Sequence, residues 1–259
     1  MKDLPAMIWV EVRKALRSKL PLWITLGALF MPLGVACLIL LAKNPDLSHR
    51  LGLVSAKADL IAFSAVDWKS YLVLFAGIIS AGGYFFFIMT ISWVFGREFA
   101  DGTLKDMLAV PVQRSSILLA KFFVAGTWCA TIAVIIYGLG LLMGVIIKLP
   151  GGSFNTILHG SIVTLVTAGL TIAVVLPFAF FASIGRGYLL PMGVAILSLI
   201  TANVLMVVGW AEYFPWAIPM LYAQGEIPLT PVSLSIVFLT SLAGMIGTYL
   251  WWKTADQNR

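Results

Sequence analysis

This sequence has little charge, few cysteines and none of the clustered side chains that form metal sites. Only 11% of its 259 residues are charged, whereas a soluble domain carries about 25%. The cysteines Cys37 and Cys129 and the histidines His49 and His159 are far apart in the chain, so the spacing of a metal site is absent. No Gly-Lys dipeptide occurs, which excludes the usual phosphate-binding loop. These absences point away from a soluble domain, a metal centre and an ATP-binding subunit of that kind.

What the sequence does contain is six long runs without a charged side chain. A transmembrane helix needs about 20 apolar residues at 1.5 Å rise per residue, and each run has close to that length or more. The runs are 22–41, 71–95, 122–147, 162–184, 188–210 and 234–252. The sequence therefore predicts an all-α polytopic membrane protein with six transmembrane helices, in which residues 1–259 form a single transmembrane domain.

The distribution of positive charge predicts how these spans are oriented. If the N-terminus is cytoplasmic, cytoplasmic segments hold twelve of the 17 Lys and Arg residues and outer segments hold the other five. The twelve are Lys2, Arg13, Lys14, Arg17, Lys19, Arg97, Lys105, Arg114, Lys121, Arg186, Lys253 and Arg259. This bias follows the positive-inside rule, so both termini are expected in the cytoplasm. Nucleic acid is not expected as a partner, because no basic patch is interleaved with aromatic residues on a soluble face.

The segment 1–20 has the pattern of an amphipathic helix, over residues 4–18. Ile8, Val12 and Leu16 recur every four residues on one face, and charged residues that include Glu11 fill the rest. An apolar face beside a cationic face is typical of a helix that lies in the headgroup region of a membrane. We therefore expect an interfacial elbow helix before the first span.

The segment 211–233, between the fifth and sixth runs, combines four prolines with many aromatic and apolar residues. It is too apolar for a solvated loop, and Trp and Tyr are favoured at membrane interfaces. Backbone at membrane depth must be covered by protein or line a cavity. The pattern predicts short broken helices that re-enter the bundle from the outer side.

Two features inside the runs predict local helix geometry. Gly140 and Gly144 have the spacing of small residues that allow helices to approach closely. A dimer interface is one use of such a pair, and packing within the chain is the other. Pro177 lies about two turns from the inner end of the fourth run, where a proline can bend or relax a helix.

The most charged internal stretch is the segment 96–114, between the second and third runs. Gly102 permits a turn, and Thr103 can cap a short helix. Apolar residues recur on one side of that helix at helical spacing; they are Leu104, Met107 and Leu108. Pro111 ends the helix, because the residue before a proline disfavours helical geometry. A short helix of this kind suits docking into a groove on a partner protein, and an ordinary polar connector is the alternative.

The motifs around this segment resemble the signature of type-2 ABC exporter permeases. They read Glu98-Phe99-x-x-Gly102-Thr103-Leu104-Lys105, Pro111-Val112-x-Arg114 and Leu118-Leu119-Ala120-Lys121. Members of that family have six spans, an interfacial N-terminal helix, a coupling helix after the second span and short re-entrant helices before the last. The same features are expected here in the same order. Within the family, the chain is most similar to the bacitracin- and lantibiotic-immunity permeases, which also lack a fused domain.

The resemblance implies the transmembrane subunit of an ATP-driven exporter in the bacterial cytoplasmic membrane. In this family two permeases, identical or paralogous, pair in the membrane, and each docks on a separate ABC ATPase subunit that binds ATP and magnesium. This chain would then bind no cofactor itself and would act in transport, not as an enzyme. The residues implied in ATPase coupling are Glu98, Asp101, Gly102, Thr103, Leu104, Lys105, Met107, Leu108 and Arg114, with Arg186 and Gly187 as a smaller second contact.

The lack of ionisable residues in the six runs bears on the cargo. Charged groups within spans mark ion pathways and intramembrane catalysis, so an intramembrane enzyme and an ion-coupled carrier are disfavoured. A path of Met, Phe, Leu, Thr and Asn side chains suits an apolar or amphipathic cargo, such as a peptide antibiotic, a drug or a lipid-like molecule. Sodium export and a non-transporting immunity or scaffold protein are the alternatives. Candidate path residues are Tyr84, Ser198, Thr201, Asn203 and Met206.

Overall fold

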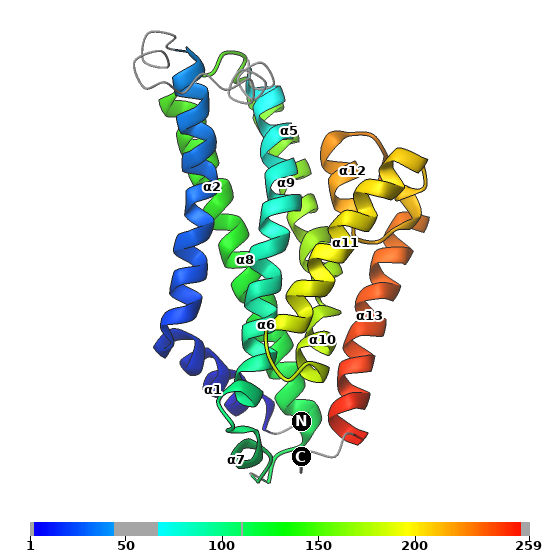
Figure 1. The fold of residues 1–259 in the computed structure, drawn as a ribbon. Coiled ribbons are helices and arrows are strands. Elements are labelled where there is room, and N and C mark those ends of the chain that lie inside the picture. The colour runs from blue at the N-terminus through cyan, green and yellow to red at the C-terminus, as the bar shows by residue number, and fades with distance from the viewer. Residues whose placement is uncertain (1–2, 44–66, 110, 255–259) are drawn as a thin grey trace.

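The computed structural model describes residues 3–43, 67–109 and 111–254, and the regular structure within these ranges is entirely helical (Figure 1). Six helical stretches in the described part of the chain are long and apolar enough to cross a membrane. They are Lys19–Cys37, Trp68–Ala100, Arg114–Ile146, Phe154–Ile184, Leu189–Val208 and Pro231–Thr254. The predicted all-α fold with six spans is confirmed. Lys2 and Arg259, two of the expected cytoplasmic cations, and His49 lie outside the described residues.

The first helix, α1 (Leu4–Arg17), lies across one end of the bundle, and α2 (Lys19–Lys43) rises from it as the first span (Figure 1). The two helices are separated at Ser18, whose backbone is extended with ψ 141°. Glu11 is among the buried residues of α1, whereas Leu16, on the predicted apolar face, is 69% exposed. A helix is thus present where the sequence predicts one, with Glu11 turned towards the protein and Leu16 exposed.

The second span contains a change of helix type. It runs as α5 (Trp68–Ile78), a π-helical turn η1 (Ile79–Gly83) and α6 (Tyr84–Ala100). The span begins with a capping box, in which Asp67 accepts from the Ser70 backbone N–H at 2.8 Å. Hydrogen bonds from Ser70 hold the pKa of Asp67 below its usual value. A π turn inside an α-helix widens it by one residue, and this turn divides the span into an upper and a lower half.

The third span, α8 (Arg114–Ile146), packs against α5 through glycine. A Cβ atom added at Gly140 would lie 2.4 Å from the ring of Phe75, and one at Gly144 would lie 2.6 Å from the ring of Trp68. The Tyr71 hydroxyl also donates to the Gly140 carbonyl at 2.8 Å. The close-packing glycine pair predicted from the sequence therefore accommodates aromatic rings of the same chain.

The fourth span is divided near its lower end. Helix α9 (Phe154–Val175) is followed by α10 (Phe178–Ile184), with Pro177 at the junction. The break lies where the sequence predicts a bend, since proline removes a backbone donor and disturbs the preceding turn. A tight turn then leads into the fifth span, α11 (Leu189–Val208).

The segment between the fifth and sixth spans folds back onto the bundle. It contains η2 (Ala211–Tyr213) and α12 (Ile218–Gln224), and α13 (Pro231–Thr254) forms the last span. Helix α12 packs against α9 and α5, and the Trp216 indole N–H donates to the Val174 carbonyl of α9 at 2.9 Å. The segment is held by the bundle, as expected for a re-entrant element.

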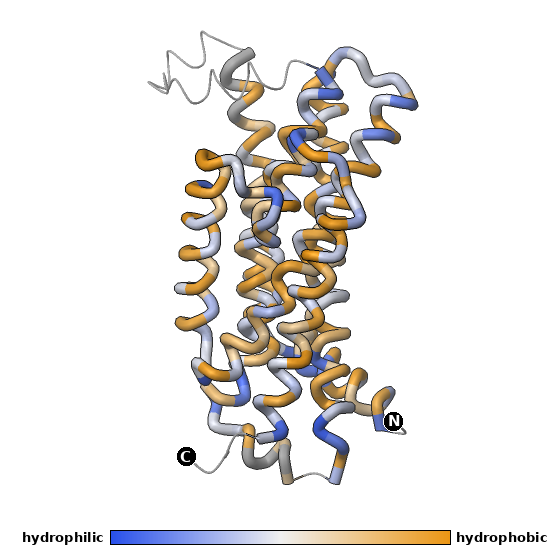
Figure 2. Tube along the Cα trace, turned by 90° about the vertical axis from the view of Figure 1, so that its right-hand side faces the viewer, coloured by the Kyte–Doolittle hydropathy of each residue, from blue (hydrophilic) through white to orange (hydrophobic). Residues whose placement is uncertain are grey.

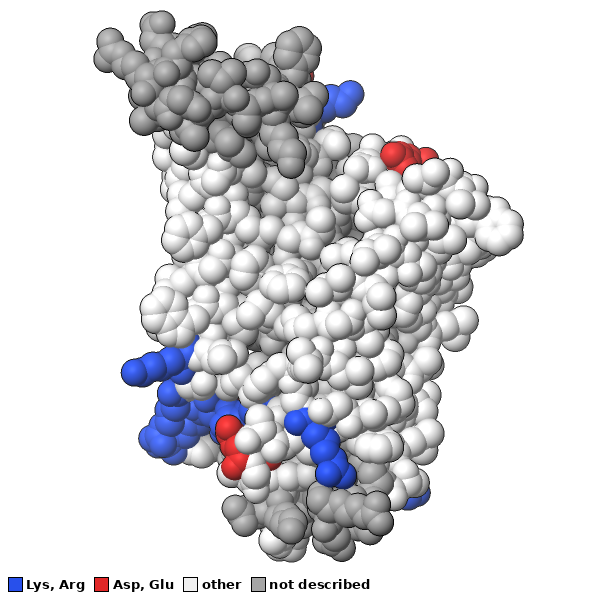
Figure 3. All heavy atoms as spheres, viewed as in Figure 1, with Lys and Arg blue, Asp and Glu red and all other residues white. Residues whose placement is uncertain are grey.

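The two ends of the bundle differ in charge. Figure 2 shows apolar residues along the middle of the tube and hydrophilic residues gathered towards both ends. On the face drawn in Figure 3, Lys and Arg gather at the end that carries α1 and the connection from α6 to α8. We call this the α7 end, and the opposite one the α12 end. The asymmetry has the sense that the positive-inside rule requires when the α7 end is cytoplasmic.

Candidate functional site

A short helix lies at the end of the bundle, in the connection between the second and third spans (Figure 1). This helix, α7 (Leu104–Ala109), covers the residues for which the sequence predicts a coupling helix. Gly102 adopts φ +69°, a left-handed conformation that glycine adopts without strain. The Met107 N–H then donates to the Thr103 carbonyl at 3.1 Å. The turn and the helix therefore follow directly from the glycine and from the helical spacing after it.

The surface around α7 is divided between exposed and buried positions. Asp101, Gly102 and Thr103 are exposed at the tip of the turn. Leu104 is only 7% exposed and belongs to the core, and Met107 is half-buried against it. The side chains of Lys105 and Leu108, also predicted to contact a partner, lie outside the described residues. The turn is the part of the described segment that is free to meet a partner.

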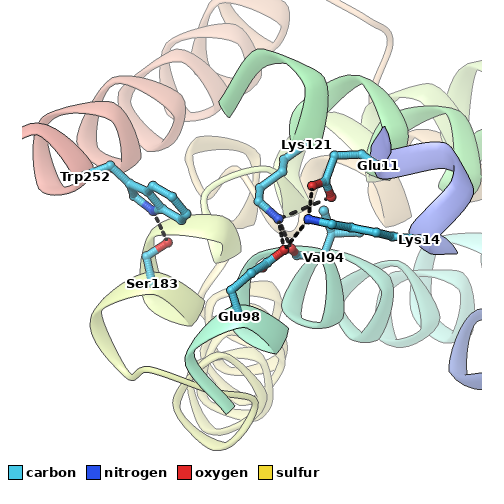
Figure 4. Close-up of polar contacts among 7 residues, drawn as sticks. All are labelled: Glu11, Lys14, Val94, Glu98, Lys121, Ser183 and Trp252. Atoms are coloured by element: carbon cyan, nitrogen blue, oxygen red, sulfur yellow. Dashed lines mark hydrogen bonds and ion pairs between the residues drawn. The ribbon is translucent and has the colours of Figure 1, made fainter. Parts of the chain in front are cut away.

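Above α7, a buried lysine joins three helices (Figure 4). The Lys121 ammonium of α8 is fully buried and lies 2.7 Å from Glu98 Oε1 of α6 and 3.3 Å from Glu11 Oε2 of α1. It also donates to the Val94 carbonyl at 2.9 Å. Lys14 completes the group, since its ammonium lies 2.7 Å from Glu11 Oε1 and 3.3 Å from Glu98 Oε1. We call these four charged residues the Lys121 cluster.

The charges of the Lys121 cluster balance, with two lysines against two glutamates. Removing a charge from water costs several kcal/mol unless it is paired and hydrogen-bonded, which explains why none of the four stands alone. Burial by itself would raise the pKa of Glu11, but the charges of Lys121 and Lys14 outweigh it and hold that pKa below its usual value of 4.5. The folded protein thus favours the ionised carboxylate form of Glu11.

The burial of Glu98 bears on its predicted role. The resemblance places Glu98 in the cleft of a partner ATPase, but in the structure its side chain is 2% exposed. The reason is that α6 remains helical as far as Ala100, which turns Glu98 towards α1 and α8. Glu98 is therefore an internal contact in this conformation, one turn from the exposed tip at Asp101.

A second junction ties the last span to the same region. The Trp252 indole N–H of α13 donates to Ser183 Oγ of α10 at 2.9 Å (Figure 4). The ring of Phe99 in α6 meets the Trp252 ring edge-on, with centroids 5.9 Å apart. The Arg114 guanidinium, at the start of α8, donates to the Trp252 carbonyl at 2.7 Å. Arg114, predicted as a coupling residue, thus links the segment that follows α7 to the end of α13.

The two regions predicted to contact a partner lie side by side. A Cβ atom added at Gly96 of α6 would lie 3.0 Å from the Gly187 carbonyl oxygen in the turn between α10 and α11. The adjacent Arg186 is exposed and adopts φ +48°. Burial and then the negative charge of Asp101 raise the pKa of Tyr188, which follows this turn. The 186–187 turn therefore packs against α6 at Gly96, one to two turns before the exposed Asp101 tip.

The predicted path residues are brought together only in part. The hydroxyls of Tyr84 and Ser198 are hydrogen-bonded at 2.6 Å between α6 and α11, and both side chains are buried. Thr201 and Asn203 are exposed on α11 and bond to carbonyls of their own helix. Met206 packs in a small cluster beside the segment that follows α11. The structure thus places one polar pair inside the chain and two polar groups on its outer surface.

Sequence reasoning missed the Lys121 cluster as a unit. Glu11 and Lys121 are 110 positions apart, and no local pattern indicates that they meet. One signal was available on α8 itself, where Lys121 shares a helical face with Ile117 and Ala125, both buried. A lysine on the apolar side of a helix indicates a buried ion pair.

Comparison with known proteins identifies the class to which this architecture belongs. Residues 7–203 match the family described as "ABC-2 family transporter protein". The chain belongs to this family, and it is a multi-pass permease subunit of an ABC transporter in the bacterial cell membrane. It is also 28% identical over 221 residues to the bacitracin transport permease protein BCRB of Bacillus licheniformis. That similarity covers 83% of this chain and 97% of the relative. Membership of the family implies a partner ATPase.

Proposed function

We propose that this chain is the transmembrane subunit of an exporter that moves an apolar or amphipathic cargo out of the cytoplasm or the inner leaflet. It docks on a separate ABC ATPase through α7, the exposed turn before it and the 186–187 turn. Two such permeases, identical or paralogous, form the complete pathway with two ATPase subunits. ATP and magnesium bind to those partners.

The observation that carries the proposal is how α7 is connected to the bundle. It lies in the chain between α6 and α8, and the ion pairs of the Lys121 cluster hold those two helices to each other and to α1. If a partner moves the Asp101 tip, the displacement therefore acts on α1, α6 and α8, because the cluster that joins these helices is only one or two helical turns away from the tip. Because buried ion pairs and packed rings have discrete arrangements, they transmit a displacement instead of absorbing it.

The nature of the cargo is supported by two observations. The relative BCRB is named for bacitracin transport, and bacitracin is a peptide antibiotic. In addition, α11 presents apolar side chains with few polar groups on its exposed face, where Leu197 and Val204 are 64% and 57% exposed. A surface of this kind matches a peptide or lipid-like molecule better than a hydrated ion, whose passage needs charged or carbonyl ligands.

Docking is tested by purifying the tagged chain with its ATPase from mild detergent. The double variant Asp101→Lys with Thr103→Arg changes only exposed side chains of the tip, so we expect normal membrane insertion and loss of most of the co-purified ATPase. The control is Glu212→Lys, which reverses one acidic charge, as Asp101→Lys does, at an exposed site of the α12 end. Equal ATPase recovery from wild type, tip variant and control contradicts the docking surface.

Transport is distinguished from sequestration by a second experiment. Cells that express the chain with its ATPase are expected to tolerate a higher concentration of the peptide antibiotic. An ATPase variant that binds but does not hydrolyse ATP should abolish that tolerance. Tolerance that persists with the inactive ATPase would identify a non-transporting immunity protein and overturn the exporter proposal.

A further inference from the structure

A cavity of about 860 Å³ opens at the α12 end, between α5, α9 and α12. Its size is in the range of sites that bind small molecules. Six polar side chains lie around it, and they come from all three helices: Lys69 from α5, Asn155, Thr156 and His159 from α9, and Tyr222 and Gln224 from α12. The cavity thus joins the second and fourth spans to the re-entrant segment.

The deeper part of the cavity is apolar, and its arrangement is regular. Val73 lies four residues after Lys69 on α5, and Val163 lies four residues after His159 on α9. A separation of four residues places the second side chain on the same helix face, about 6 Å further along the axis. On both helices, therefore, a polar group at the mouth is followed by valine one turn further into the bundle.

The polar groups at the mouth are available to a ligand. Within the described part of the chain, the side chains of Lys69, His159 and Gln224 make no hydrogen bond or ion pair. The described residues that line the cavity include no Asp or Glu. The nearest acid in sequence, Asp67, has its carboxylate in hydrogen bonds to Ser70 at the start of α5. Lys69 is therefore the one charged side chain among the described lining residues, with Asp67 two positions before it and Glu226 next to the lining residue Gly225.

We propose that this cavity binds an amphipathic anion from the membrane. The anionic headgroup, of the phosphate type, lies against Lys69 and His159, and the hydrocarbon chain follows the valines towards the middle of the bundle. The position suits such a ligand, because Lys69 stands in the first turn of one span and His159 in the second turn of another. A lysine near the end of a membrane helix can attract an anionic lipid headgroup, and the apolar part of the cavity gives the attached chain a place to pack.

The experiment measures lipid retention by the purified full-length chain. Native mass spectrometry counts how much phosphatidylglycerol or phosphatidylcholine stays bound after both are added in detergent. We expect wild type to retain the anionic lipid preferentially. Lys69→Gln should lower its retention about fivefold, and Val73→Trp, which fills the apolar part, should lower the retention of both lipids.

The matched control is Lys148→Gln. Lys148 is an exposed lysine at the same end and does not line the cavity, so this change should leave retention as in wild type. Equal retention of the two lipids by wild type, or an equal loss from Lys69→Gln and Lys148→Gln, would overturn the proposed site. These measurements need no ATPase, and so their failure is separable from that of the exporter proposal.

The same measurement with the complete transporter identifies the source of the anion. If the ligand is cargo, adding ATP and magnesium should empty the site in wild type. If it is a resident membrane lipid, the amount bound should be unchanged by turnover. Both results support an anion-binding site in this cavity. Loss of the ligand on turnover identifies it as cargo, and its retention identifies it as a resident lipid.

Discussion

Lys121 carries its charge on a fully buried side chain. Its stability depends on Glu11 and Glu98, which belong to other helices and are themselves almost fully buried. A network of this kind is costly to break but not necessarily costly to replace, because well-packed apolar side chains need no pairing at all. At the scale of the single residue, the charges thus fix which helices meet.

Removing the lysine alone should therefore damage the protein more than removing the whole network. We expect Lys121→Met to lower the free energy of unfolding by about 3–5 kcal/mol, since both glutamates lose their closest buried partner. The triple variant Glu11→Met, Lys121→Met and Glu98→Met, which replaces the buried charges by apolar side chains, should recover most of that loss. Thermal unfolding in detergent measures both, with the exposed Lys148→Met as control. A triple variant no more stable than the single one argues against charge pairing as the cause.

The pH dependence follows from Glu11. Its pKa is lower in the folded protein than its ordinary value of 4.5, so the unfolded state takes up the proton first. The stabilisation is therefore complete well above pH 4.5 and is lost as the pH falls through that value towards the folded-state pKa. We expect the melting temperature of wild type to fall more steeply than that of Glu11→Gln between pH 5.5 and 3.5. Parallel curves would show that Glu11 contributes nothing to the acid sensitivity.

At the scale of the helix, close packing depends on positions without a side chain. Gly244 of α13 is the clearest case, because an added Cβ atom would lie 2.4 Å from the Cα atom of Pro177. That neighbour is backbone at the break between α9 and α10, and it cannot move aside as the end of a flexible side chain could. The proline break and the glycine thus belong to a single contact.

Gly244→Ala should accordingly destabilise the protein by about 1–3 kcal/mol through overpacking. The control lies in the same helix, where a Cβ atom at Gly247 would make an ordinary 3.5 Å contact with Phe180. We expect Gly247→Ala to be neutral or to stabilise by up to about 1 kcal/mol, because alanine favours the helix. Thermal unfolding of the two variants in the same detergent decides the matter, and equal effects would refute the packing argument.

Much of the element pattern could be predicted from the sequence, for identifiable reasons. The six spans follow from uncharged runs, and α7 follows from Gly102 and the leucines after it. The position of Glu98 could not be predicted, because it depends on the packing of α6 against α8 and on ion pairs with Lys14 and Lys121. The cavity at the α12 end was missed for a similar reason, since Lys69 and His159 are brought together only by the fold.

At the scale of the whole molecule, the two ends have different tasks. The α7 end holds the exposed tip and the Lys121 cluster, and the α12 end holds the cavity and the re-entrant segment. The proposed function requires these ends to face opposite sides of the membrane, with the α7 end in the cytoplasm. This orientation is open to a direct test with single cysteines.

Asp101→Cys and Glu212→Cys place a thiol at exposed positions of the two ends. With Cys37→Ala as background and Cys129 buried, a membrane-impermeant maleimide should label Glu212→Cys in intact cells. Asp101→Cys should react only after the cells are permeabilised. Labelling of Asp101→Cys in intact cells would reverse the topology and with it the site of ATPase docking.

The π turn at Ile79–Gly83 has a consequence for how this chain is compared with its relatives. The π turn accommodates one extra residue. The side chains of α5 and α6 therefore point in the same relative directions as they would in a continuous α-helix that is one residue shorter. A relative lacking a single residue at this point can therefore present equivalent surfaces at both ends of the span. Elsewhere in the span, the same deletion rotates one half by about 100° against the other. A one-residue alignment gap inside 79–83 thus leaves the helix faces on both sides correctly matched. If the gap is placed elsewhere in the span, every residue between the gap and the π turn is matched to a residue on a different helix face.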